Sequence, residues 1–131
     1  MFAELFVLLY AAHLAADYPL QTDHQAGHKA DCSTAGWRAN LAHAGTHVGV
    51  CALALLVGAA VLGDSAGIPA SVAALVWIGA THAVIDRRWP VARWMRFARQ
   101  AGWAQHGGAA HVDQTAHVLA LVVAALFLAA V

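Results

Sequence analysis

Charge is scarce in this 131-residue sequence. Aspartate, glutamate, lysine and arginine make up 11% of the residues, whereas soluble domains contain about 25%. Hydrophobic residues make up 61%, so most of the surface is expected to contact something other than water. Seven basic and seven acidic side chains give a formal net charge of +0, and this balance gives no reason to expect a nucleic-acid partner.

Cysteine is rare, and the common catalytic motifs are missing. Cys32 lies in a polar segment and Cys51 inside an apolar run, so a disulfide is not expected and Cys51 should pack in the core. There is no Gly-x-Ser-x-Gly motif, P-loop or His-Glu-x-x-His motif, which leaves serine hydrolases, nucleotide-binding proteins and zincins without support. No basic residue precedes the first apolar run, which we expect to be retained rather than cleaved as a signal peptide.

Four apolar runs predict helices, at residues 2–18, 37–62, 69–86 and 111–131. A membrane-spanning helix needs about 20 apolar residues, and the first run is short by this measure. Pro19 ends that run, and residues 63–69 have the composition of a turn. We therefore predict an all-α fold: an integral membrane four-helix bundle with up-down-up-down topology, forming a single transmembrane domain over residues 1–131.

A short amphipathic helix is predicted at residues 91–100, before the last span. Arg93, Arg96 and Arg99 recur at every third position there, with large apolar residues between them, which suits a helix lying at the membrane surface. These arginines are expected to contact anionic lipid headgroups or, alternatively, a phosphate group of a substrate.

The basic residues predict the orientation. All seven lie in segments that the predicted topology places on one side of the membrane: Lys29, Arg38, Arg87, Arg88, Arg93, Arg96 and Arg99. The positive-inside rule makes that side cytoplasmic. We therefore expect a multi-pass protein of the cytoplasmic (inner) membrane with both termini outside, whose partner is the lipid bilayer.

Each run contains two residues of ligand type four positions apart: histidine and aspartate in three runs, and two histidines, His43 and His47, in the second. Side chains at this spacing share one face of a helix, and the alternating chain direction would bring all four pairs to the cytoplasmic end. Imidazole nitrogens and carboxylate oxygens bind zinc, iron and manganese. The sequence therefore predicts a site for one or two divalent transition-metal ions, with these candidate ligands: His13, Asp17, His43, His47, His82, Asp86, Asp113 and His117.

Simpler roles remain open for each pair. A single histidine inside a membrane often only hydrogen-bonds one helix to another. Asp17 and Asp86 stand at helix ends, where they could face lipid headgroups instead of a metal ion. Eight ionisable groups in four spans, however, would be hard to tolerate unless they neutralised one another or a cation.

Other polar and small residues carry weaker expectations. His24 and His28 lie in the polar segment 21–36, expected to be a loop or a partly helical connector, and His106 and His111 lie in or beside residues 102–110, expected to be a flexible connection. Asn40 shares the face of His43 and could orient it. Gly45 and Gly49 form a small-xxx-small pair, which indicates close helix packing or a homodimer face.

The ordered motifs resemble a bacterial family of small integral membrane proteins of unknown function. Its pattern is His-x3-Asp with a following Gln, a Lys in the next loop, His-x3-His, His-x3-Asp and a late Asp-Gln-x2-His. The matching residues here are His13, Asp17, Gln21, Lys29, His43, His47, His82, Asp86, Asp113, Gln114 and His117. More loosely, the sequence is similar to membrane-bound metal-dependent hydrolases. The resemblance implies a metal and says little about the reaction.

Three functions fit these patterns. The first is a metal-dependent hydrolase of a lipid or lipid-linked ester or phosphoester, with Asp17, Asp86 or Asp113 as general base. The second is a non-catalytic metal-binding or metal-transport protein, although the outer halves of the later runs are nearly all apolar. The third is a haem-binding electron-transfer protein, which the carboxylates beside nearly every histidine fit poorly. We rank the hydrolase first.

Overall fold

The computed structural model describes residues 1–63 and 66–131, and these residues form helices without any strand. The prediction of an all-α fold is thus confirmed for the described part of the chain. The elements follow in the order α1 (Phe2–Asp17), α2 (Asp23–His28), α3 (Thr34–Leu62), α4 (Ile68–Ile85), α5 (Trp89–Phe97), α6 (Ala101–Trp103), the π-helix η1 (Ala104–Gly108) and α7 (Ala109–Ala130).

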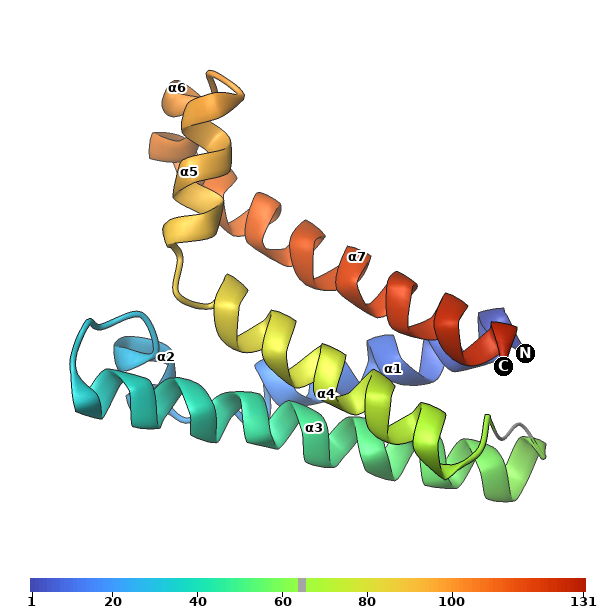
Figure 1. Ribbon diagram of the computed structural model, residues 1–131. Helices are drawn as coiled ribbons and strands as arrows, with labels where there is room; N and C mark the ends of the chain where they lie inside the picture. The colour runs from blue at the N-terminus through green and yellow to red at the C-terminus, as the bar shows by residue number, and fades with distance from the viewer. Residues whose placement is uncertain (64–65) are drawn as a thin grey trace.

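The four long helices form a closed ring. Helix α1 packs against α3 and α7, and α4 packs against the same two helices. The chain direction alternates from one long helix to the next, so that both termini lie at one end (Figure 1). The short helices α2, α5 and α6 lie at the opposite end of the ring.

Three helical stretches are long and apolar enough to cross a membrane: α3, α4, and residues 101–130, which include α7. Helix α1, with 16 residues, is shorter than the roughly 20 that a span normally needs. Large apolar side chains are exposed around the long helices, including Leu56 and Val61 on α3, Val76 on α4 and Leu119 on α7. An apolar outer surface of this extent is suited to lipid rather than to water.

Local sequence signals explain several helix ends. Helix α1 ends at Asp17, two residues before Pro19, which lacks the N–H that a helix needs. Helix α2 begins with a capping box, in which the side chain of Thr22 accepts from the N–H of Gln25 and the side chain of Gln25 accepts from the N–H of Thr22. Gly63 ends α3 in the left-handed conformation, with φ of +74°.

Some boundaries differ from those predicted. Helix α5 begins at Trp89, two residues before the predicted start, because Pro90 is well suited to the first turn of a helix. The connection predicted for residues 102–110 is wrong in part: α6 and η1 give it helical turns, interrupted at Gly107, where φ is +89°. Within the predicted turn at residues 63–69, Asp64 and Ser65 lie outside the described residues.

The interior is divided into an apolar half and a polar half. On α1 the buried residues Leu5 and Leu9 are followed at the same four-residue step by His13 and Asp17. Helix α4 shows the same change, from Ala74 and Ile78 to His82 and then Asp86. The apolar half also contains Cys51, Leu121, Ala125 and Leu128, so Cys51 packs as predicted. The polar half lies toward α2 and α5.

Gly45 and Gly49 lie on an exposed face of α3. A Cβ atom added at either position would meet nothing within 4 Å. Close packing of this face against another helix of the same chain is therefore not seen among the described residues. A homodimer through this face stays a prediction.

Candidate metal centre

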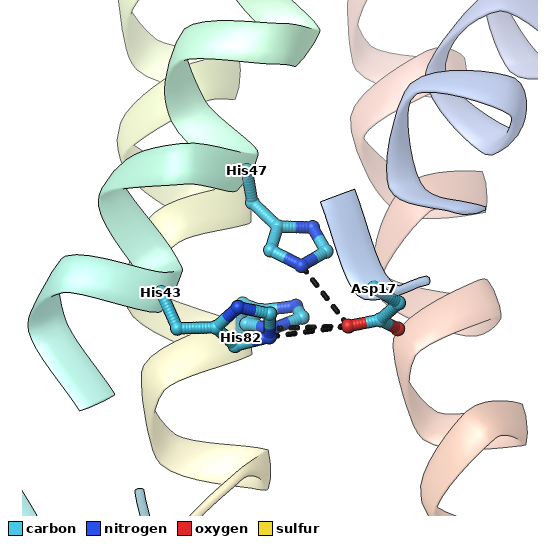
Figure 2. Close-up of side chains that lie close together, drawn as sticks. All are labelled: Asp17, His43, His47 and His82. Atoms are coloured by element: carbon cyan, nitrogen blue, oxygen red, sulfur yellow. Dashed lines mark hydrogen bonds and ion pairs between the residues drawn. The ribbon is translucent and has the colours of Figure 1, made fainter. Parts of the chain in front are cut away.

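Asp17 is the centre of one group of ligand-type side chains. The Nε2 atoms of His43 and His47 each lie 3.1 Å from its Oδ1 atom, and Nε2 of His82 lies 3.9 Å from the same oxygen. The four side chains come from α1, α3 and α4 and point toward one another (Figure 2). They could hold a metal ion, because one ligand atom of each lies within 4.8 Å of the others and all four residues are buried.

A second group contains His82, Asp86 and His117, from the end of α4 and from α7. Nε2 of His82 lies 3.1 Å from Oδ2 of Asp86, and Nε2 of His117 lies 3.9 Å from Oδ1 of Asp86. These three residues are also buried, and their ligand atoms again lie within 4.8 Å of one another. Because His82 belongs to both groups, the two candidate sites are adjacent.

His13 and Gln114 complete the surroundings of Asp17. Nε2 of His13 lies 3.1 Å from Oδ2 of Asp17 and 3.4 Å from the side-chain oxygen of Gln114. The amide nitrogen of Gln114 donates to Oδ2 of Asp17 over 3.4 Å. Gln114 therefore ties α7 to α1 at the level of the carboxylate. Only the family pattern signalled this residue in the sequence.

Asp113 occupies a different place from the other predicted ligands. Its carboxylate lies 3.5 Å from Nδ1 of His117, whereas the nitrogen of His117 that faces the second group is Nε2. Nδ1 of His117 donates to the main-chain oxygen of Asp113 over 3.0 Å, which leaves Nε2 as the nitrogen with a free lone pair. This placement favours Asp113 as a group that orients His117. A direct bond from Asp113 to a metal stays a prediction.

The unpartnered atoms fit a cation. Nε2 of His82, Oδ2 of Asp86 and Nε2 of His117 are buried without a hydrogen-bond partner among the described residues, and buried polar atoms are rarely left so. Nε2 of His82 and Oδ2 of Asp86 are only 3.1 Å apart, which is close to the spacing of about 3.0–3.4 Å between two atoms that bind one ion at about 2.1 Å. The donor set therefore fits a metal ion in both distance and chemistry.

The crowding of the imidazoles supports the same reading. The ring centroids of His47 and His82 are 3.5 Å apart, and those of His82 and His117 are 4.3 Å apart. Positive charges on rings this close would repel strongly in a buried setting. The neutral imidazole, which is the form that binds metals, avoids this repulsion.

A lysine balances the charge of Asp86 but not that of Asp17. Nζ of Lys29, from the C-terminal end of α2, lies 3.0 Å from Oδ1 of Asp86. The ion-pair partners of Asp17, by contrast, are all histidines in the part of the chain that the structure describes. A buried carboxylate requires compensating positive charge. For Asp17 that charge must come from a protonated imidazole or from a bound cation.

Arg87 holds Lys29 in position. Its guanidinium donates to the main-chain oxygens of Lys29 and Asp31, over 2.9 and 2.7 Å. The same group lies over the ring of Trp37, 4.2 Å from its centroid. Arg87 is buried, although the sequence indicated for it only a role in setting the membrane orientation. Asn40 also differs from its predicted role, because it donates to the main-chain oxygen of Ala83 over 3.1 Å and not to His43.

The remaining histidines lie outside both groups. His24 and His28 stack on each other with ring centroids 4.5 Å apart, and His111 stacks on Trp103. His106 donates from Nδ1 to the main-chain oxygen of Gly102. All four histidines are exposed, so the structure gives them no part in either group.

A cleft of about 840 Å³ opens beside the second group. Asp86, Asp113 and Lys29 line its inner end, and residues of α5, α6, η1 and the start of α7 form its walls. The volume is in the range typical of small-molecule sites. The arrangement can therefore bring a substrate to the edge of the His/Asp cluster without opening the bundle.

Comparison with known proteins gives a family but no described activity. Neither the curated proteins nor the solved structures contain a match to the chain. The model of a family described as "Protein of unknown function (DUF3307)" matches residues 5–131. The match covers α3, α4 and α7 and all but the first three residues of α1, and the chain belongs to this DUF3307 family of proteins of unknown function.

Proposed function

We propose that the protein is an integral membrane metalloprotein that hydrolyses an ester or phosphoester bond of a lipid or lipid-linked substrate at the cytoplasmic face. The observation that carries this proposal is the set of three buried ligand atoms without a hydrogen-bond partner, on His82, Asp86 and His117, of which Asp86 also lines the cleft. Metal-dependent hydrolases need such a buried N/O donor set beside a space that admits the substrate.

The proposed cofactor is a divalent transition metal: zinc, iron or manganese. The donors are imidazole nitrogens and carboxylate oxygens without a thiolate, which suits any of these three ions. Two groups that share His82 support a centre of one or two ions. The residues that would hold them are Asp17, His43 and His47 on one side and Asp86 and His117 on the other, with His13 beside Asp17.

Hydrolysis of an ester uses one water molecule. The water oxygen bonds to the phosphorus or carbonyl carbon, the ester bond to the leaving oxygen breaks, and the leaving alcohol takes up a proton. A bound divalent cation would acidify the water and polarise the ester. Asp113 is the carboxylate best placed to move a proton, because it lines the cleft and its side chain is 24% exposed. Asp17 and Asp86 are better placed as ligands.

The proposed site of action is the cytoplasmic face of the inner membrane. In this proposal α1 joins α3, α4 and α7 as a fourth, short span, with both termini outside. Lys29, Arg87 and Arg88 belong to the same end as the His/Asp cluster, and the positive-inside rule assigns that end to the cytoplasm. Helix α5, with its exposed Arg93 and Arg96, would lie at the headgroup level.

Transport and haem binding have less support. A transport path needs polar groups at several depths, but the buried residues of the opposite half are apolar in the described part of the chain. The cavity beside His13, His82 and His117 measures about 10 Å³, which is about the size of one water molecule. A porphyrin would not fit between these helices unless they moved apart.

Turnover assays test the proposal. Detergent-purified protein, stripped with a chelator and reloaded with zinc, iron or manganese, should hydrolyse a panel of carboxyl esters and phosphoesters only after reloading. His82→Ala should lose this activity, and His106→Ala, which changes an exposed histidine outside both groups, should keep it. Activity that never depends on added metal would contradict the proposal.

A further inference from the structure

The cleft beside the second group is lined by three basic and two acidic residues. Lys29, Arg88 and Arg96 line it, and the acidic residues in its lining are Asp86 and Asp113, both at the inner end. Asp86 is already engaged by Lys29, 3.0 Å away. Arg88 and Arg96 have no ion-pair partner among the residues that the structure describes. Neither guanidinium group is held in a salt bridge, although Arg88 attracts the Asp113 carboxylate, and both arginines line a space that also reaches Asp86.

The backbone at Arg88 is unusual in a way that suggests a ligand. Arg88 has φ of +63°, a conformation that glycine or asparagine adopts more easily than arginine. It is the N-cap residue of α5, and Trp89 and Val91 of the first turn also line the cleft. The positive end of the α5 dipole therefore adds to the attraction for an anion. Strained residues of this kind cluster where proteins hold ligands.

Most of the remaining lining is apolar. It includes Val91, Ala92 and Met95 from α5 and Ala101 and Ala104, and its uncharged polar residues are Gln21 and Gln105. A small inorganic anion would leave this part of the space unused. The cleft thus combines three basic side chains with a largely apolar lining, and it suits an amphiphilic molecule with an anionic headgroup.

We infer that the cleft binds the phosphate group of an amphiphilic phosphomonoester, held by Lys29, Arg88 and Arg96 next to the candidate metal centre. This inference rests on the proposed function and names its substrate class. A phosphomonoester carries about −1.5 to −2 charge near neutral pH, which two free guanidinium groups and a shared ammonium group can neutralise. A neutral carboxyl ester would have no use for these charges.

Binding measurements with matched variants test the inference. The probes are dioctanoyl phosphatidic acid, inorganic phosphate and dioctanoylglycerol, each titrated calorimetrically into the full-length protein in detergent with metal supplied. Arg96→Gln is matched by Arg93→Gln, an exposed arginine of the same helix outside the cleft lining. Arg88→Asn is matched by Arg99→Asn, since Arg99 also has a positive φ, of +56°, and does not line the cleft.

The expected result is that the protein binds phosphatidic acid at least tenfold more tightly than inorganic phosphate and does not bind dioctanoylglycerol. Arg96→Gln and Arg88→Asn should weaken phosphatidic acid binding about tenfold or more, and the two control variants should not. Equal losses in the controls, or equal binding of dioctanoylglycerol, would overturn the inference. Equal affinity for inorganic phosphate would overturn the assignment to a lipid headgroup.

Metal content, measured on the same samples, separates this inference from the proposed function. Protein that contains metal but binds no phosphate probe would overturn the inference alone. Protein that binds phosphatidic acid through Arg96 but never holds a metal would support the cleft as a phosphate site and would overturn the proposed metalloenzyme.

Discussion

His82 is the side chain that both ligand groups share. It extends the buried stripe of Ala74 and Ile78 on α4 by one further step of four residues. The same step leads from Leu9 to His13 on α1. At these positions the chain replaces a packing side chain by a ligand, without changing the face of the helix that is buried.

The spacing made this part of the site predictable. Two side chains four residues apart on an apolar helix point to the same side of the helix, and their place in the run gives their depth in the membrane. His43 and His47 could therefore be expected to meet His82 inside the bundle. Lys29 could not be placed by the same rule, because it lies in a polar segment where no periodicity fixes the face. Its contact with Asp86 depends on how α2 folds back on the bundle.

Asp113→Asn should separate catalysis from metal binding. Asp113 faces the outer nitrogen of His117, so the amide should leave the metal content unchanged while removing the group proposed to move a proton. Turnover should fall by about 10²-fold or more. Kinetic assays and elemental analysis of the same preparation measure both effects. Loss of metal in this variant would instead make Asp113 a ligand.

Helix α2 is fastened to the bundle mainly through main-chain oxygens. Arg87 donates to the carbonyl groups of Lys29 and Asp31 at the end of α2 and in the following loop. Such acceptors have no sequence signature, since every residue carries one. From the sequence, Arg87 could be used only as one of the basic residues that indicate orientation, and the fold reveals it as a positioning residue.

Arg87→Met should loosen α2 and weaken the site. It would leave two carbonyl groups without their charged donor, and hydrogen bonds to charged groups are worth about 1.5–3 kcal/mol each. We expect the free energy of unfolding in detergent to fall by about 3 kcal/mol, with weaker metal binding because Lys29 is no longer held. Arg38→Met, which changes an exposed arginine on α3, should leave both quantities unchanged. Equal stability of the two variants would argue against this anchoring role.

Gly36→Ala tests the junction between α2 and α3. A Cβ atom at Gly36 would clash with the main-chain oxygen of Asp31, whereas one at Gly45 would meet nothing within 4 Å. Overpacking of this kind costs about 1–3 kcal/mol. Thermal unfolding should therefore show a lower midpoint for Gly36→Ala and an unchanged one for Gly45→Ala. An unchanged midpoint for Gly36→Ala would mean that the loop containing Asp31 can move to make room for the added methyl group.

The molecule as a whole reverses the usual arrangement of polarity. Histidine and aspartate are buried, while leucine and valine cover the long helices. Composition and the four apolar runs predicted this arrangement. A chain with 11% charged residues has too few charged side chains to give its whole surface a polar cover suited to water. The short elements α6 and η1 were not predicted, since the glycines around them indicated a flexible connection and their helical turns arise next to α7.

The native cysteines provide a test of orientation. Cys32 is exposed, in the segment between α2 and α3, and Cys51 is fully buried. If the cluster end faces the cytoplasm, a membrane-impermeant maleimide should label Cys32 in inverted vesicles and not in intact spheroplasts. Cys32→Ser should abolish the labelling. Strong labelling in intact spheroplasts would place this end outside and contradict the proposed topology.

The most direct test of the central claim is the metal content of the detergent-purified protein. Elemental analysis after dialysis should find one to two equivalents of a divalent transition metal in the unaltered protein. Less than about a tenth of that amount should remain in a folded His82→Ala variant, because His82 belongs to both groups, and His106→Ala should match the unaltered protein. Full metal content in folded His82→Ala, or no metal in any sample after loading with zinc, iron and manganese, would contradict the account.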